Sequence, residues 1–187
     1  SFHNSDGGIN KLRIQSGNSG NSLQIDHNAQ GSSIGDNSWH HVAVVSTGSI
    51  YNVYIDGVFD FSKSGTTNFS SADRASIGQE YDGPNPSDHF NGTIDNIQFW
   101  NSARTIGQIN TDMNQALIGT EPGLVAYFDF EDGTGSSVAT DIVSGNNGAL
   151  TNMDPATDWV NSTAPITSVS LTNNITATAD ASGVYPV

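Results

Sequence analysis

The chain has 187 residues, of which 5 are basic and 19 are acidic, so its formal net charge is −14. Such a surface repels nucleic acids and anionic membranes, and neither is expected as a partner. The absence of cysteine excludes disulfides, thiolate metal sites and cysteine nucleophiles. No apolar run reaches the roughly 18 residues of a membrane helix, so membrane insertion is not expected either.

Short strand signals recur along the chain, separated by clusters of Gly, Asn, Asp and Ser. In most of them apolar and polar residues alternate, which is typical of strands in a sandwich or barrel. The Asp56-Gly57 pair between two such segments predicts a tight hairpin turn. We expect strands over residues 11–15, 23–26, 41–45, 51–55, 58–59, 74–77, 93–100 and 124–130.

One segment has a helical pattern. Within residues 105–117 apolar residues recur at spacings of three and four, and Gly119 follows. We therefore expect one all-β antiparallel sandwich with a short helix over residues 1–163. Residues 164–187 are expected to form a linker, the first strands of an adjoining immunoglobulin-like repeat, or a strand that returns to the sandwich.

A loop crowded with carboxylates, amides, prolines and glycines lies between two of the expected strands. Glu80, Asp82, Asn85 and Asp88 offer many oxygens at close range, and Ca²⁺ takes six to eight such ligands. Like charges this close repel one another unless a cation neutralises them. The loop therefore predicts a calcium site, and His89 in the same loop is a candidate for ligand contact. The alternative is a solvated loop that keeps its charges apart.

Several segments follow one another in a characteristic order. They are Ser38-Trp39-His40-His41-Val42-Ala43, Tyr54-Ile55-Asp56-Gly57, Ile77-Gly78-Gln79-Glu80, Phe90-Asn91-Gly92-Thr93-Ile94-Asp95-Asn96-Ile97-Gln98-Phe99-Trp100-Asn101 and Gly123-Leu124-Val125-Ala126-Tyr127-Phe128. Their order resembles the laminin-G-like jelly rolls of the concanavalin A-like superfamily, and within them the pentraxins. The resemblance covers residue 1 to about residue 130 and implies a two-sheet antiparallel jelly-roll sandwich.

Pentraxins hold paired Ca²⁺ ions on one sheet face and use them to bind phosphocholine, sugars or other oxygen-rich ligands. Their metal loop has a Gly-Gln-Glu-x-Asp pattern, which residues 78–82 match. Carried over by position, the resemblance implies metal ligands at Glu80, Tyr81 (through its backbone carbonyl), Asp82, Asp88 and Asn10. Residues in contact with the bound ligand would be Asn85, His89, Tyr81 and Asp6. Asp6 would replace the missing aspartate of an early Asp-Asn pair. The counterpart of a further glutamate ligand is open between Asn85 and Ser87, and so is a second calcium.

The resemblance implies a non-catalytic, calcium-dependent glycan-binding module of a secreted or cell-surface adhesin. Its partners would be glycans of a host or neighbouring cell surface, with phosphate- or carboxylate-bearing ligands also open. One alternative is a glycoside hydrolase that uses Asp129 and Glu131, which alternate on the last expected strand. Others are a second metal site that adds Asp141 and Asn146, and a structural or peptide-binding module that calcium stiffens.

Two further expectations concern the rest of the sandwich. His40 and His41 are adjacent, so they point to opposite sheet faces, cannot share a metal, and are expected to be structural. Relatives carry roughly three strands before the segment that matches Ser1-Phe2. Because residues 145–150 and Asp158-Trp159 resemble such a first strand, we expect the C-terminal third or a partner chain to supply the missing strands.

Overall fold

The computed structural model of the chain describes residues 13–16, 23–26, 34–65, 75–82, 85–87 and 89–167. Its elements are β1 (Arg13–Ser16), β2 (Leu23–Asp26), β3 (Val42–Ser46), β4 (Ile50–Ile55), β5 (Val58–Ser64), β6 (Glu80–Asp82), β7 (Asn85–Ser87), β8 (Ile97–Trp100), α1 (Ile106–Asp112), β9 (Leu124–Phe128), β10 (Val138–Ala139) and β11 (Gly148–Ala149). These strands pair antiparallel, in the orders β1-β2, β3-β4-β5, β6-β7, β8-β9 and β10-β11. An antiparallel all-β fold with one short helix is therefore confirmed.

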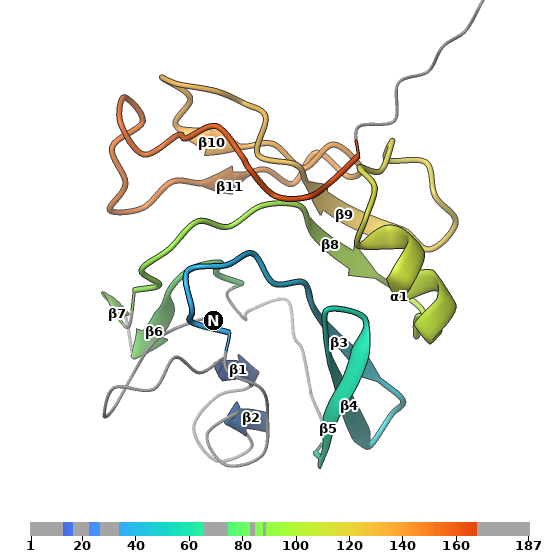
Figure 1. The fold of residues 1–187 in the computed structure, drawn as a ribbon. Coiled ribbons are helices and arrows are strands. Elements are labelled where there is room, and N and C mark those ends of the chain that lie inside the picture. Colours follow the sequence, from blue (N-terminus) through green and yellow to red (C-terminus); the bar gives the residue numbers. More distant parts are fainter. Residues whose placement is uncertain are drawn as a thin grey trace, which may run out of the picture.

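The elements form layers around the β8–β9 pair (Figure 1). The β10–β11 hairpin lies above β8 and β9, the β3–β5 sheet lies below them, and α1 lies beside them. The β6–β7 hairpin is at the opposite side of the molecule from α1. None of the described helices has the length and hydrophobicity of a membrane span.

The largest departures from the expected bounds concern the strands around the acidic loop, the last strong strand and the helix. Residues 75–79 form no strand, and β8 begins only at Ile97, because Asn96 takes a left-handed φ of 50°. The strand expected to reach residue 130 ends at Phe128, since Phe130 has a φ of 57° and leaves the extended conformation. The helix ends at Asp112 rather than Leu117, and the backbone then turns to Thr167, whose N–H donates to the Asn114 carbonyl and whose carbonyl accepts from the Ala116 N–H.

The β3–β5 sheet encloses the first of two cores. Tyr51, Val53 and Ile55 alternate along β4 and are buried together with Phe61 of β5, which lies opposite Val53. This confirms the period of two that the sequence shows for this segment. The Asp56-Gly57 turn joins β4 to β5 with φ angles of 50° and 74°, the left-handed conformation that a two-residue hairpin requires.

The turn at Gly57 also fits against helix α1. A Cβ added at Gly57 would lie 1.9 Å from Asn110 Oδ1 and 3.2 Å from Met113 Sδ. Gly57→Ala should therefore destabilise the domain by about 1–2 kcal/mol for the left-handed backbone, and further because the Asn110 amide must move. Gly48→Ala is the matched control, because Gly48 also has a positive φ, of 94°, but nothing within 4 Å of its Cβ position. Chemical denaturation that gives equal losses for both variants would contradict the contact with α1.

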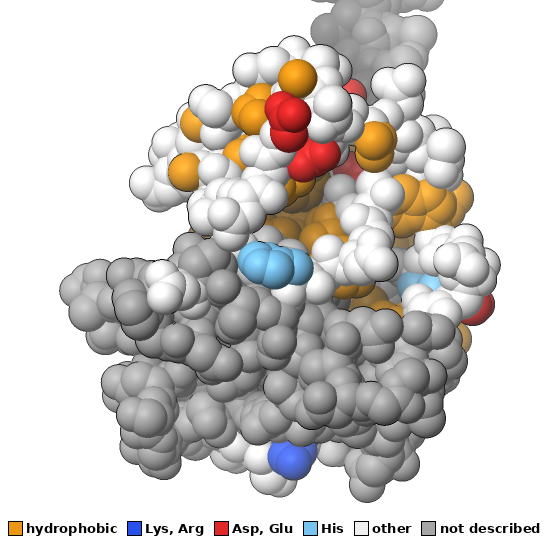
Figure 2. All heavy atoms as spheres, turned by 90° about the vertical axis from the view of Figure 1, so that its left-hand side faces the viewer, with side chains coloured by type: hydrophobic (Ala, Val, Ile, Leu, Met, Phe, Trp, Pro, Cys, Tyr) orange, Lys and Arg blue, Asp and Glu red, His pale blue; other side chains and the backbone are white. Residues whose placement is uncertain are grey.

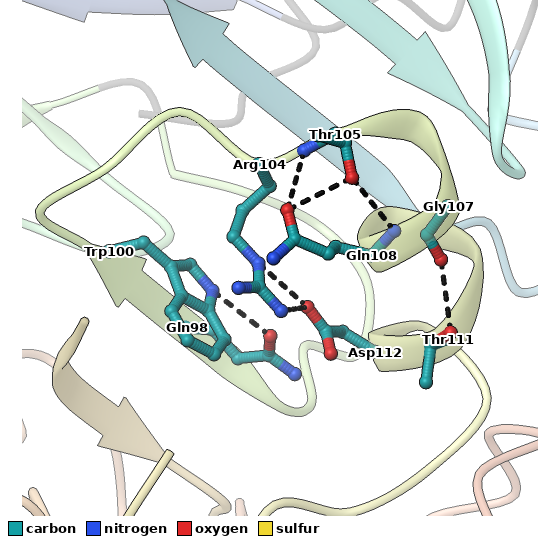
Figure 3. A network of polar contacts seen from close by, with 8 residues as sticks. All are labelled: Gln98, Trp100, Arg104, Thr105, Gly107, Gln108, Thr111 and Asp112. Carbon is teal, nitrogen blue, oxygen red and sulfur yellow. Dashed lines mark hydrogen bonds and ion pairs between the residues drawn. The ribbon is translucent and has the colours of Figure 1, made fainter. Parts of the chain in front are cut away.

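Helix α1 is fixed at both ends by polar contacts (Figure 3). Thr105 and Gln108 form a capping box, in which the Thr105 side chain accepts from the Gln108 N–H and the Gln108 side chain accepts from the Thr105 N–H. Arg104 donates to the Asp112 carboxylate through Nε, at 3.0 Å, and through a terminal nitrogen, and its guanidinium carbon lies 3.8 Å from the centroid of the Trp100 ring. The helix is thereby tied to β8.

The C-terminal third belongs to the same fold. β9 pairs with β8, and Leu124 and Tyr127 of β9 form a second buried cluster with Leu117. The last described residues then return to distant parts of the chain. The contacts are Trp39 Nε1 donating to Thr163 Oγ1 at 2.9 Å, Ser162 Oγ donating to Asp95 Oδ2, and a parallel bridge between Gln115 and Thr167. Residues beyond 167, and with them most of the expected 164–187 linker, lie outside the described residues.

Candidate functional site

The loop that the sequence marks as a metal site contains the β6–β7 hairpin. Its register opposes Glu80 to Ser87, Tyr81 to Pro86 and Asp82 to Asn85. Opposed residues in an antiparallel pair share a face, and alternate residues of one strand share a face. Positions 80, 82, 85 and 87 therefore belong to one face of the hairpin, and each of them carries an oxygen-bearing residue.

Two hydrogen bonds to backbone carbonyls fix the base of this hairpin. The Phe90 N–H donates to the Gly78 carbonyl at 2.7 Å, and Ser76 Oγ donates to the Gln79 carbonyl at 2.6 Å. Gly78 has a φ of 75°, and a Cβ there would meet Ile94 Cδ1 at 3.4 Å. A glycine before the two acidic positions is therefore needed for the turn into β6.

The structure places some of the sequence-predicted residues and not others. Asn85 and His89 are exposed, as a ligand-contacting role requires. Positions 80 and 82 share the face of Asn85, whereas Tyr81 occupies the opposite face. Asp88, Asn10 and Asp6 lie outside the described residues. Among the residues that are described, no group of three or more His, Asp or Glu is arranged to hold a metal ion, so the calcium site stays a prediction.

The residue set at this face nevertheless fits a hard cation. Carboxylates, an amide and a hydroxyl are the oxygen donors that Ca²⁺ takes at flexible sites. In the sequence, Ser87 is a candidate only as the replacement for a glutamate ligand that the pentraxin pattern has and this chain lacks. The pairing that opposes Ser87 to Glu80 cannot be inferred from the sequence. The hairpin signal was present, since only Gly83 and Pro84 separate the two strands.

Figure 2 looks onto the side of the molecule where β6 and β7 lie in Figure 1. A histidine side chain lies near the middle of this face, and acidic side chains gather above it. Between them the surface is hollowed, and apolar side chains show in the hollow. Such a mixture of polar rim and apolar floor suits a ligand that has hydroxyl groups and apolar faces.

The pair expected for glycoside hydrolysis does not lie on a strand. β9 ends at Phe128, and the left-handed φ of 57° at Phe130 separates Asp129 from Glu131 by a turn. The Glu131 N–H donates to Asp129 Oδ1 at 3.3 Å, so this carboxylate supports the local turn. The prediction that the two acids alternate on a strand is wrong, and with it the geometric basis of the hydrolase alternative.

Asp141, expected as a ligand of a second metal, is buried, with 2% of its surface exposed. Its Oδ1 accepts the N–H groups of Tyr127, Val143 and Ser144 at 3.0, 3.1 and 3.3 Å, and its Oδ2 accepts the Ser144 hydroxyl. Burial alone would raise its pKa, but these hydrogen bonds outweigh burial and lower the pKa to about 2. Asn146 donates its amide to Ser144 rather than facing a shared site. The geometry therefore favours a structural role for Asp141 over a second metal site.

The sequence matches the laminin G profile described as the concanavalin A-like lectin/glucanases superfamily, over residues 1–110 of the 187. The rat sushi, von Willebrand factor type A, EGF and pentraxin domain-containing protein 1 is 29% identical over 119 residues, which are 58% of this chain and 3% of the rat protein. The chain thus spans a small fraction of that relative's length.

A solved structure from Bacteroides ovatus, described as a candidate carbohydrate-binding protein, superposes with a TM-score of 0.58 at 20% identity. The match covers 77% of this chain and 40% of that one, and it shows the fold. An S-layer domain-containing protein from Clostridium thermocellum reaches a TM-score of 0.38 at 17% identity over 59% of this chain and 66% of its own, which supports no argument. With its antiparallel strands and the profile match over more than half of its length, the chain belongs to the concanavalin A-like lectin/glucanases superfamily.

Proposed function

We propose that this chain is a non-catalytic module that recognises carbohydrate through a bound Ca²⁺ ion. The observation behind the proposal is the register of the β6–β7 hairpin, which gathers positions 80, 82, 85 and 87 on one face. Two of the four carry carboxylates, so a divalent cation there would relieve their repulsion. Asn85 and His89 are exposed beside it and are the side chains that would select the ligand.

The metal ligands of the proposal are Glu80, Asp82, the Tyr81 carbonyl, Asp88 and Asn10. Since Ca²⁺ takes six to eight oxygens, this set leaves positions that the hydroxyl groups of a sugar can complete. The Bacteroides ovatus protein of similar fold is described as a candidate carbohydrate-binding protein, which supports a sugar ligand. The net charge of −14 argues against nucleic acid as a partner.

The proposal places the protein at the outside of a cell, as part of an adhesin that binds glycans of a host or neighbouring surface. In this proposal Asp129 and Glu131 do not hydrolyse the glycan. Retaining glycosidases hold two carboxyl groups about 5 Å apart across the scissile bond, and Asp129 instead accepts the Glu131 N–H within a turn.

Removing the two strand carboxylates should abolish calcium binding. In calorimetric titrations the wild type should bind Ca²⁺, and Glu80→Gln/Asp82→Asn should give no measurable heat of binding. The matched control is Asp129→Asn/Glu131→Gln, which removes the same charge from the turn after β9 and should titrate like the wild type. Equal affinity of the wild type and the β6 variant would refute the site.

Binding of sugar should then depend on the metal. On a glycan array we expect signal in millimolar Ca²⁺ and its loss in EDTA, and β-glucans incubated with the protein should release no reducing sugar. Equal array signal with and without EDTA would contradict the proposal. A melting temperature that rises with Ca²⁺ without any array signal would instead support the structural alternative, a module that calcium only stiffens.

A further inference from the structure

A charged bridge lies where the chain enters β3, away from the β6–β7 hairpin. His40 Nδ1 lies 2.7 Å from Asp56 Oδ2, and His40 Nε2 lies 3.1 Å from Asp36 Oδ1. The His40 side chain is 17% exposed, while the two carboxylates are about half exposed, at 53% for Asp36 and 50% for Asp56. We call Asp36, His40 and Asp56 the His40 bridge.

The geometry determines the protonation state of this histidine. A neutral imidazole has one N–H, so it can donate to only one of two carboxylates, and its other nitrogen then turns a lone pair toward the second. The imidazolium donates to both. An ionised carboxylate only accepts hydrogen bonds, so neither aspartate can supply the second proton. Both short contacts are therefore satisfied only when His40 is charged.

The His40 bridge joins the segment before β3 to the turn between β4 and β5. Asp56 belongs to the turn between β4 and β5, and its Oδ1 also accepts the His41 N–H at 2.8 Å. The neighbouring Gly57 packs on Asn110 of α1, as described above. Trp39, on the other side of His40, donates to Thr163 of the C-terminal segment. Contacts of the helix and of the C-terminal segment thus lie at Gly57 and Trp39, each one residue along the chain from a member of the His40 bridge.

We infer that His40 is a pH-responsive tie, which holds the segment before β3 to the β4–β5 turn when protonated and loosens this contact when the pH rises. The charged groups that face it are Asp36 from the segment before β3 and Asp56 from the β4–β5 turn. Asp112 of α1 acts on the adjacent His41 rather than on His40.

The two adjacent histidines should respond to pH in opposite directions. The hydrogen bond to Asp56, assisted by Asp36, holds the pKa of His40 above its usual value in spite of burial. Burial holds the pKa of His41 below its usual value, and its Nδ1 is buried without a hydrogen-bond partner in the described structure. His40 therefore contributes stability that is complete below pH ~6.5 and is lost as the pH rises through its folded-state pKa. His41 contributes stability that is complete above pH ~6.5 and is lost as the pH falls toward its lowered folded-state pKa.

Thermal unfolding of the full chain between pH 5.5 and 8.5 tests the tie. We expect the wild-type Tm to fall by about 2–4 °C more over this range than the Tm of His40→Gln, whose amide cannot carry the charge. His41→Gln is the control, because it should change the pH dependence in the opposite sense. In 1 M NaCl the difference between wild type and His40→Gln should shrink, since both carboxylates are half exposed.

A second measurement uses the unmodified protein, so the inference can be tested even where His40→Gln does not fold. Two-bond ¹H–¹⁵N correlation spectra should show protons on both ring nitrogens of His40 at pH 6.5 and a titration midpoint above that of a free histidine. A single protonated nitrogen at pH 6.5, or equal pH dependence of Tm in wild type and His40→Gln, would overturn the inference.

Discussion

Replacing Arg104 with methionine should lower the free energy of unfolding by about 3 kcal/mol. Arg104 and Asp112 are nearly buried, with side chains 16% and 11% exposed, and the guanidinium donates twice to one carboxylate oxygen. Methionine keeps the packing of the side-chain stem but leaves the Asp112 charge without its partner. The contact between Arg104 and the Trp100 ring, worth about 0.5–1 kcal/mol, is lost as well.

Two further variants separate the buried pair from the loss of a positive charge. Lys63→Met removes the same charge from an exposed position of β5 and should stay within about 0.5 kcal/mol of the wild type. Arg104→Met/Asp112→Leu should recover much of the loss, because no charge is then left buried. Urea denaturation gives all three values. A double variant as unstable as Arg104→Met would show that the stranded carboxylate is not the cause.

Asp141→Ala is the second substitution for which a large loss is expected, about 3 kcal/mol. Three backbone N–H groups converge on Asp141 Oδ1, and each buried donor left without an acceptor costs about 1–3 kcal/mol. The Tyr127 N–H is the most sensitive of them, since Tyr127 is 1% exposed and part of the second core. Glu131→Ala removes an exposed carboxylate nearby in sequence and should be close to neutral.

The ionised Asp141 carboxylate should also make the free energy of unfolding sensitive to acid. The pKa of Asp141 is lowered from 3.8 to about 2, so the folded state binds its proton less readily than the unfolded state. Its contribution is complete above about pH 3.8 and is lost as the pH falls through 2. Denaturation curves at pH 2, 3 and 5 should therefore converge for wild type and Asp141→Asn at the acid end. Parallel curves across this range would contradict the role of the ionised form.

Local signals in the sequence were enough to predict the core of the fold. The alternation at Tyr51, Val53 and Ile55 predicts β4, and the Asp56-Gly57 pair predicts the turn that follows it. Both depend on residues close in sequence, so pattern and structure agree. The start of α1 was also visible, since Thr105 and Gln108 have the spacing of a capping box, although it was not used in the prediction.

Where prediction failed, contacts that local periodicity does not encode decided the structure. The pattern of residues 124–130 continues to alternate, but Phe130 adopts a left-handed conformation and its ring stacks on Phe128 at 6.3 Å between centroids. The helical pattern continues to Leu117, but the backbone of residues 114–116 pairs with Thr167. Neither partner can be inferred from local periodicity.

The candidate site, too, could be predicted from the sequence only in part. Its composition was readable, because oxygen-bearing residues crowd the loop after Gly78. Which of them share a face depends on the strand pairing that opposes Asp82 to Asn85. Nothing in the sequence around Asp141 indicates that three backbone N–H groups converge on its carboxylate. The His40 bridge could not be predicted either, because Asp56 comes from a turn 16 positions away.

The bond between Trp39 and Thr163 spans 124 positions, and this separation has a consequence for how the protein is made. During synthesis the β3–β5 sheet can pair as soon as it leaves the ribosome, whereas the Trp39 indole must wait for the C-terminal segment. Contacts between distant segments raise the contact order and slow folding. Nascent chains arrested before residue 163 should accordingly remain protease-sensitive around Trp39 while β4 is already protected.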